Sequence, residues 1–461
     1  MATLSSPGVG SGLDIAGIVS KLMALESQPL IRLQTREAGF QAKLSGFGAL
    51  KGALSALQAT AKTLATPSTF AGMLASSSDS SVLSVSASST ALAGSYEISV
   101  SKLAKAHVVR TNVDYGSDTF DSGVLRVAIG SGTPTDITLS GTLGLGGIRD
   151  AINGADAGVK ASIVNDGTAD RLLLTSLTTG SAGAVTISAP TSNGDGDRPL
   201  TDLIGGNLTA VQPAQDAEFT VDGLAITRSS NTISDVIDGI TLKLLKADAS
   251  TPVTSTVAVS RNTAAVSSAV SGFVKAYNDS MAQIKSLTAY DSTNKRASIL
   301  TGDSTVRSIQ SQLAGLVSTA VSGVEGGISR LSDVGIRVQT DGSLAVDNGT
   351  LGTVLADNID AVAAVFSQTT DDNEGIAVRF GSALDGIVGS TGLIASRTAG
   401  ITASITDLQH QADAFNLRLT AIEKRYRSQF TALDTLVASM NQTSAYLTQQ
   451  LASLSSLNSS K

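Results

Sequence analysis

The chain has 461 residues, a net charge of −7 and only 3% aromatic residues, and it contains no Cys. Without Cys there is no disulfide framework, no thiol catalysis and no thiolate metal site. The negative charge argues against a nucleic-acid partner, because binding a phosphate backbone depends on Lys and Arg.

No apolar run approaches the roughly 18 residues that a membrane-spanning helix needs. Residues 1–12 are small and polar, unlike the apolar centre of a secretory signal peptide. We therefore expect no membrane partner, and either a protein that stays inside the cell or one exported without a cleavable signal.

The N-terminal part of the chain reads as two helices. Asp14 is a good N-cap for the first helix, and Pro29 either kinks that helix or starts the second one, which stops before Thr66. Apolar residues recur at helical spacing along both predicted helices: Ile15, Ile18, Leu22, Leu25, Leu33, Phe40, Leu44, Phe47, Leu50, Leu54, Leu57, Ala61 and Leu64.

After Pro67 the apolar period changes from helical to alternating, which predicts strands. Short strands are expected through residues 82–187 and again through 219–259, with one small helix at 148–153. Asp222 and Gly223 predict a hairpin turn between alternating runs. The loop 190–199 is rich in Gly, Asn and Asp and is predicted to be an exposed tip or a linker.

Helical spacing returns from Val266 to Leu287, and Asp303 is expected to cap another helix. A second hairpin is predicted at 336–346, followed by helices at 351–366 and 376–388.

Residues 401–461 contain neither Gly nor Pro, and their apolar side chains recur at steps of three and four. This spacing predicts one long helix with an apolar seam, interrupted by an extra step of four, a stutter, before Phe430. The seam comprises Ile401, Ile405, Leu408, Ala412, Phe415, Leu419, Ile422, Tyr426, Phe430, Leu433, Val437, Met440, Ser444, Leu447, Leu451 and Leu454. Such a helix needs a partner, and the N-terminal helices are the simplest one; two unrelated surface helices are the alternative.

The order of helices, strands and helices predicts a nested α+β multidomain architecture: a coiled-coil stalk of terminal helices, a mixed helical inner domain and inserted β-rich outer domains. The stalk is assigned to residues 1–40 and 415–461, and the inner domain to 41–75 and 262–414. The β-rich outer domain takes 76–110 and 213–261, and an outermost β-rich domain takes 111–212.

No catalytic, cofactor or metal site is predicted. The two histidines, His107 and His410, lie on different predicted elements, so a catalytic pair is not expected. Residues 193–197 resemble the start of a calcium loop, but Arg198 and Ile204 stand where such a loop needs Gly and Glu. The Gly-rich run at 144–147 lacks the Gly-Lys-Ser/Thr of a phosphate loop. We therefore expect no enzyme.

The predicted C-terminal helix carries a basic cluster formed by Arg418, Lys424, Arg425 and Arg427, which Glu423 interrupts. It is either a solvated face with intrahelical ion pairs or an electrostatic docking patch.

Both ends of the chain resemble the flagellar filament cap family, also called hook-associated protein 2 or the FliD family. The resemblance rests on residues 11–14 (SGLD), 22–30 (LMALESQPL), 425–434 (RYRSQFTALD) and 440–447 (MNQTSAYL). Residues 300–307 (LTGDSTVR) and 333–336 (DVGI) are similar to the inner domain of that family. Residues 143–180, which include IRDAIN at 148–153, look like a flagellin-type repeat.

The resemblance implies a ring of identical subunits, a pentamer or hexamer, at the distal tip of the filament. There it would promote the folding and incorporation of exported flagellin. Its other implied partners are the junction proteins, a cytoplasmic export chaperone at the C-terminus and, as an option, host mucin or glycans. Export by the flagellar type III route would fit the missing signal peptide. A flagellin or junction subunit is the first alternative, and a surface adhesin or secreted hydrolase is the second.

Overall fold

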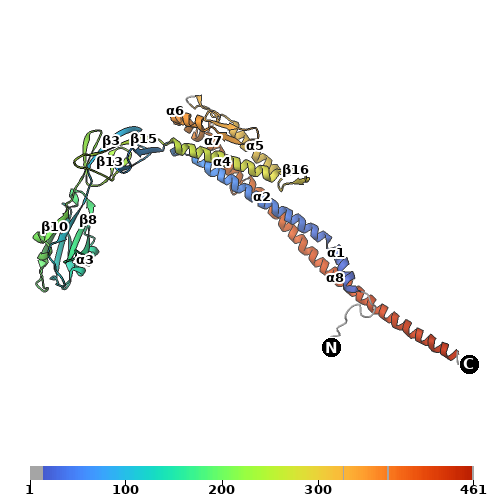
Figure 1. Ribbon diagram of the computed structural model, residues 1–461. Helices are drawn as coiled ribbons and strands as arrows, with labels where there is room; N and C mark the ends of the chain where they lie inside the picture. The colour runs from blue at the N-terminus through green and yellow to red at the C-terminus, as the bar shows by residue number, and fades with distance from the viewer. Residues whose placement is uncertain (1–13, 325–326, 371–372, 459–461) are drawn as a thin grey trace. The chain divides into compact units, whose positions relative to one another are not determined.

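The computed structural model describes residues 14–324, 327–370 and 373–458, and side chains are described as far as residue 452. The chain forms two compact units, drawn in Figure 1. Unit 1 comprises Met1–Pro67 and Val266–Lys461, and unit 2 comprises Ser68–Ala265. Residues 11–13 of the N-terminal motif lie outside the described part of the chain.

Unit 1 is mainly helical, with two short hairpins. Its helices are α1 (Ile15–Glu26), α2 (Gln28–Ala65), α4 (Thr263–Thr288), α5 (Ser304–Ser318), α6 (Asn348–Ser367), α7 (Ile376–Val388) and α8 (Leu393–Asn458). Its hairpins pair β16 (Tyr290–Asp291) with β17 (Arg296–Ala297), and β18 (Ile336–Val338) with β19 (Leu344–Val346).

Three aromatic rings lie at the centre of the unit 1 core. Phe380 of α7 meets Phe273 of α4 edge to face, with ring centroids 5.1 Å apart, and meets Tyr277 at 6.2 Å. All three side chains are buried. Such pairs add roughly 0.5–1.5 kcal/mol to the burial of the rings themselves. Three aromatic side chains of this poorly aromatic chain thus pack together between α4 and α7.

The predicted helix starts of unit 1 are confirmed. The Asp14 carboxylate accepts a hydrogen bond from the Gly17 amide at 2.8 Å, and Asp303 accepts one from the Thr305 amide at 2.9 Å. Pro29 stands in the first turn of α2, where its missing N–H costs nothing. Asp303 also pairs with Arg397 of α8 at 2.8 Å, so this cap ties two helices together.

Helix α6 differs from expectation in two ways. It kinks at Asn358, whose φ is −154°, and the Asn358 side chain accepts a hydrogen bond from the Ala361 amide, which restarts the helix. Of the described helices, α6 alone has the length and composition to cross a membrane, with a mean hydropathy of 1.2, although no sufficient apolar run was expected. Its Leu351, Val362 and Phe366 are buried in unit 1, and the helices of a protein core meet the same criterion.

Unit 2 is built from strands. They are β1 (Met73–Ser77), β2 (Leu83–Ala87), β3 (Gly94–Lys102), β4 (Ala106–Thr111), β5 (Gly123–Ile129), β6 (Thr135–Leu139), β7 (Val159–Asn165), β8 (Asp170–Thr179), β9 (Val185–Ser192), β10 (Leu208–Gln212), β11 (Ala217–Val221), β12 (Leu224–Arg228), β13 (Thr232–Ile237), β14 (Ile240–Leu244) and β15 (Val253–Arg261). One α-helix, α3 (Leu145–Gly154), and four short 3₁₀ turns accompany them: η1 (Pro67–Thr69), η2 (Ser181–Gly183), η3 (Leu200–Leu203) and η4 (Gly205–Asn207).

These strands enclose two separate cores. The first β-module, residues 68–105 and 213–265, packs the antiparallel sheet β1-β15-β3-β11-β12 with the sheet β13-β14-β2. The second β-module, residues 106–212, packs the sheet β10-β4-β8-β7 with the sheet β6-β5-β9 and with α3. The predicted hairpin is confirmed: Asp222 and Gly223 have φ of 47° and 81° and join β11 to β12.

The loop 190–199 was predicted to be an exposed tip or a linker, and the linker alternative is wrong. The Asp195 carboxylate accepts hydrogen bonds from the amide and hydroxyl of Ser122 at 2.7 and 2.8 Å. The Asp197 carboxylate accepts hydrogen bonds from the amide and hydroxyl of Thr119. The Asp121 carboxylate accepts hydrogen bonds from the Ser192 hydroxyl and the Gly196 amide. The acidic residues of this loop therefore hold it against the chain before β5.

Acid should loosen this loop. Hydrogen bonds to the ionised form hold the pKa of Asp121, Asp195 and Asp197 below 3.8, their ordinary value. Their stabilising effect is therefore complete above the unfolded-state pKa and is lost as the pH falls through the lowered folded-state values. We expect the NMR amide signals of Ser122 and Gly196 to shift together below about pH 4. Signals that stay in place down to pH 2 would contradict this assignment.

The two β-modules meet in a polar junction. The Asp216 carboxylate accepts hydrogen bonds from the Ser181 amide at 2.7 Å and from its hydroxyl at 2.5 Å. The Thr179 hydroxyl donates to the Ser229 carbonyl at 2.6 Å, and Gly180 lies against Ser229 with a φ of 89°. The junction thus has a defined geometry in which a glycine permits close approach.

Substituting Gly180 should separate the effect of close approach from that of backbone strain. A Cβ at Gly180 would lie 2.4 Å from the Ser229 Cβ, whereas a Cβ at Gly167, with a similar φ of 87°, would meet nothing within 4 Å. We expect Gly167→Ala to cost about 1 kcal/mol of unfolding free energy and Gly180→Ala to cost at least about 2 kcal/mol more, because strain and overpacking add. Urea denaturation of the two variants measures the difference, and equal losses would contradict it.

Candidate assembly surface on the terminal helices

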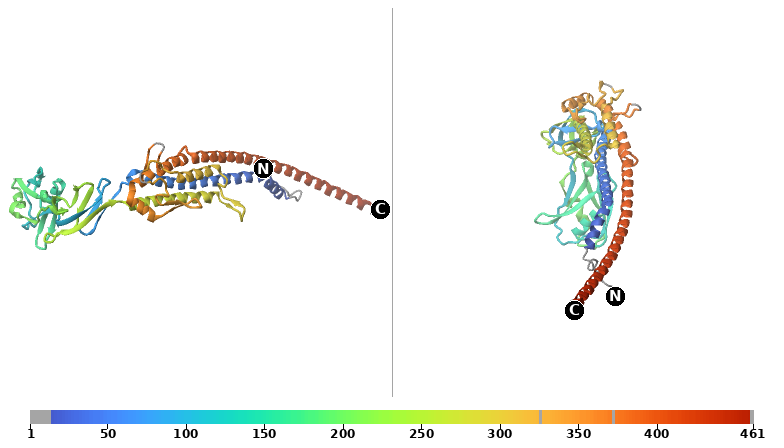
Figure 2. Two further views of the ribbon diagram at one scale, coloured as in Figure 1. Left: turned by 90° about the horizontal axis from the view of Figure 1, so that it is seen from above. Right: turned by 90° about the vertical axis from the view of Figure 1, so that its right-hand side faces the viewer.

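The two ends of the chain pair with each other. Helix α8 runs beside α2 and then beside α1, as both views of Figure 2 show. The Gln409 amide donates to the Glu37 carboxylate at 2.7 Å, and the Tyr426 hydroxyl donates to Glu26 at 3.1 Å. The prediction that the N-terminal helices are the partner of the C-terminal helix is confirmed.

The first half of the predicted seam on α8 is covered by this pairing. Ile401, Ile405 and Leu408 are buried, and Leu419 and Ile422 are only 9% and 8% exposed. Ala412, Phe415 and Tyr426 between and beyond them are half-buried. Spacing of three and four along the sequence therefore did identify the face of α8 that packs on α1 and α2.

The predicted contact residues of the N-terminal helices fall into three groups. Leu22, Leu33, Phe40 and Leu44 are half-buried. Phe47 is completely buried inside unit 1, so it cannot touch another chain in this state. Leu25 is 72% exposed, because the buried face of α1 is formed by Ile15 and Val19. The predicted face of α1 was therefore partly wrong: it included the exposed Leu25 and missed the buried Val19.

The seam beyond Tyr426 loses its cover. Phe430 and Val437 are half-buried, whereas Leu433, Met440, Leu447 and Leu451 have exposed fractions of 41%, 62%, 55% and 66%. Leu436 and Tyr446 are exposed as well. Within the described residues, this apolar stripe on α8 has no covering helix.

The basic cluster contains residues that fit each of the two hypotheses, an intrahelical ion pair and exposed cations. Arg427 pairs with Glu423 one turn earlier at 2.7 Å, as on a solvated helix face. The Arg425 guanidinium lies 5.7 Å from the centre of the Tyr426 ring. Arg418 and Lys424 are exposed and form no ion pair among the described residues. Arg418, Lys424 and Arg425 thus remain open to an acidic partner.

A groove between α2 and α8 was not predicted. It has a volume of about 630 Å³, and it is lined by Leu44, Phe47, Gly48, Lys51, Ile394, Ala395, Thr398, Ala399 and Thr402. Small residues on both helices open this groove. The sequence indicated this groove only by the run of Gly and Ala on α2, and such a run is equally typical of tightly packed helices.

The two histidines show no arrangement typical of a catalytic pair. His107 of β4 accepts a hydrogen bond at Nδ1 from the Val185 amide at 2.8 Å, which joins β4 to β9. His410 is exposed on α8. In the described part of the chain, no three His, Asp or Glu side chains gather as metal ligands would.

Comparison with known proteins identifies the family. The family model of the flagellar hook-associated protein 2 C-terminus matches residues 214–442, and that of its N-terminus matches residues 11–107. The flagellar hook-associated protein 2 of Escherichia coli O157:H7 is 35% identical over 98% of both chains. The chain belongs to the flagellar hook-associated protein 2 family. The A-type member from Pseudomonas aeruginosa is 31% identical, again over 98% of both chains.

A solved structure of this family supports the fold. The D1-D2-D3 domains of the flagellar cap protein FliD from Escherichia coli superpose with a TM-score of 0.62 at 32% identity, covering 77% of this chain and 99% of that one. The flagellin hook IN motif matches residues 127–178, inside the second β-module, where the sequence predicted a flagellin-type repeat. The resemblance seen in the sequence is confirmed, and neither a flagellin nor an adhesin is favoured.

Proposed function

We propose that this chain is a structural capping protein at the distal tip of the bacterial flagellar filament, outside the cell. Identical subunits would form a closed ring that holds emerging flagellin while it folds and joins the filament. The observation that carries this proposal is the long helix α8 of unit 1: among the described residues, no helix covers the last part of its apolar stripe. A structural partner is needed there, because exposed apolar stripes of this kind mark interaction sites.

The proposal assigns each partner to a part of the chain. Flagellin and the junction proteins would meet the terminal helices, and before export a cytoplasmic chaperone would cover the C-terminal stripe. The ring would be a pentamer or hexamer, and its contacts would be heterologous, since one face of a subunit must meet a different face of the next. A host mucin or glycan would meet the Ser- and Thr-rich surface of unit 2. The proposed role requires neither catalysis nor a cofactor.

Rescue of a cap-deficient bacterium tests the function. Supplied with this chain and a matching flagellin, such a cell should regain filaments and swim, while the same cell without the chain should release flagellin into the medium. Unchanged loss of flagellin monomer, with the chain present at the cell surface, would contradict the capping role.

The open cations of α8 are proposed to dock on acidic groups at the filament end. Lys424→Glu together with Arg425→Glu should weaken binding to isolated filaments roughly tenfold, since each exposed ion pair contributes up to about 1 kcal/mol. The loss should shrink at high salt. Lys275→Glu with Arg307→Glu changes the net charge equally on exposed positions of α4 and α5 and serves as the control. Equal weakening in both pairs, measured by co-sedimentation, would refute a specific docking patch.

A further inference from the structure

The apolar seam on α8 changes register at the stutter. From Ile401 to Ile422 the seam alternates steps of four and three, and two steps of four then lead through Tyr426 to Phe430. From there the same seven-residue repeat resumes in a shifted register: Phe430, Leu433, Val437, Met440, Ser444, Leu447, Leu451 and Leu454. A strict seven-residue repeat favours left-handed supercoiling with another helix that has the same repeat.

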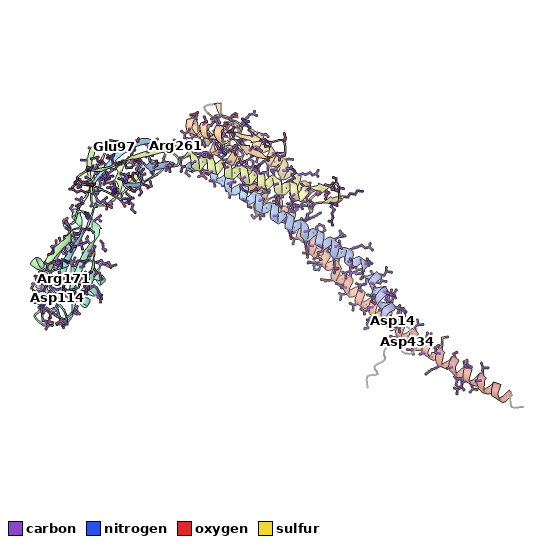
Figure 3. All side chains as sticks on the ribbon, in the orientation of Figure 1. Asp14, Glu97, Asp114, Arg171, Arg261 and Asp434 are labelled. Atoms are coloured by element: carbon purple, nitrogen blue, oxygen red, sulfur yellow. The ribbon has the colours of Figure 1, made fainter. Side chains whose placement is uncertain are left out.

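Among the described residues, the cover that the same chain provides ends within the first two turns of this repeat. Helix α1 begins at Ile15, and Ile15 and Val19 are its buried residues. Figure 3 shows Asp14, the cap of α1, at the level of Asp434, and α8 continues beyond both. The stutter and the loss of cover thus lie next to each other on α8. One half of the helix matches a partner within the chain, and the other half requires a partner from outside the described residues.

The chemistry of the uncovered half favours an identical partner. Residues 428–460 contain one charged side chain, Asp434. The positions that flank the apolar seam are otherwise uncharged: Leu436, Asn441, Thr443, Thr448 and Gln450. Copies lying side by side would therefore not repel each other, and a partner recognised by charge would find little to bind. The polar Ser444 within the seam would favour alignment in register, as polar seam residues do in coiled coils.

We propose that residues 430–454 of neighbouring subunits wrap around one another as a parallel, in-register coiled coil. This inference rests on the proposed ring, because a ring of identical subunits points all its C-termini in the same direction. In a free ring, the C-terminal ends of the α8 helices would then be joined. The stutter would mark the point at which α8 stops packing on its own chain and starts packing on the neighbouring subunit. An α8 helix that binds the filament would first have to leave this bundle.

Single cysteines test the proposal in the full-length protein, which has no Cys of its own. Leu447→Cys lies in the seam, and Gln449→Cys lies on the opposite face of the same turn. Both positions are exposed in the single chain. Under mild oxidation, Leu447→Cys should form disulfide-linked dimers at least tenfold faster than Gln449→Cys, because in-register seam residues come within disulfide reach. A mixture of Met440→Cys and Leu447→Cys proteins should form no mixed dimer.

Equal, slow linking at both positions would overturn the proposal. That result is expected if residues 1–13 of the same chain or flagellin cover the stripe instead. The mass of the unmodified assembly, measured in parallel, separates this failure from that of the proposed function. If a ring forms but Leu447→Cys does not link selectively, the coiled coil is refuted and the cap remains. If Leu447→Cys links selectively but no ring forms, the coiled coil remains and the ring is refuted.

Discussion

A chain that ends at residue 414 is expected to keep unit 2 folded and to lose capping completely. None of residues 415–461 belongs to unit 2, so its thermal transition should not move. Helix α1 loses the part of α8 against which Ile15 and Val19 are buried, and it should unfold, since an isolated helix of 12 residues is marginal in water. The truncation removes both the cations and the apolar stripe that are proposed to engage the filament.

Circular dichroism and the rescue of a cap-deficient bacterium measure the two halves of this prediction. The β-sheet signal of unit 2 serves as the internal control for correct folding. If the truncated chain supported filament growth, the terminal helices could not be the filament-binding part of the molecule.

Replacing Phe380 by Ala should destabilise unit 1 by about 3–5 kcal/mol, the usual cost of removing a fully buried aromatic side chain. Phe380 is 0% exposed and contacts the rings of both Phe273 and Tyr277. The cavity left between α4 and α7 cannot be filled by the stiff neighbouring rings, so the cost should lie toward the upper end. The helical signal at 222 nm, which comes mainly from unit 1, should be lost at a lower urea concentration.

Leu417→Ala is the matched control for this change. Leu417 is exposed on α8, and its truncation should alter stability by less than about 0.5 kcal/mol. A loss at Phe380 no larger than the loss at Leu417 would mean that the aromatic cluster does not hold the unit 1 helices together.

Local chemistry made much of this fold predictable. The helix boundaries at Asp14 and Asp303 followed from capping, and the turn at Asp222 followed from the need for positive φ. The helical period gave the face of α8 between Ile401 and Ile422 that packs on the N-terminal helices. These features depend on neighbours within a few residues, which the sequence displays directly.

Long-range pairing was not predictable in the same way. Strand β1 pairs with β15, far along the chain, and its short run Met73–Ser77 lacks the alternation of apolar and polar residues that would have indicated a strand. The carboxylate contacts of the loop at 193–197 depend on Thr119 and Ser122, which only the folded chain brings near. On α1, the choice between Val19 and Leu25 depended on where α8 lies.

Labelled protein on growing filaments tests the central claim most directly. Electron microscopy of a cap-deficient bacterium supplied with a gold-labelled form of this chain should show label only at the distal filament ends, as one closed ring per filament. Label along the whole filament would indicate a filament subunit, and label on the cell surface without filament growth would indicate an adhesin. Either of these results would contradict the capping function.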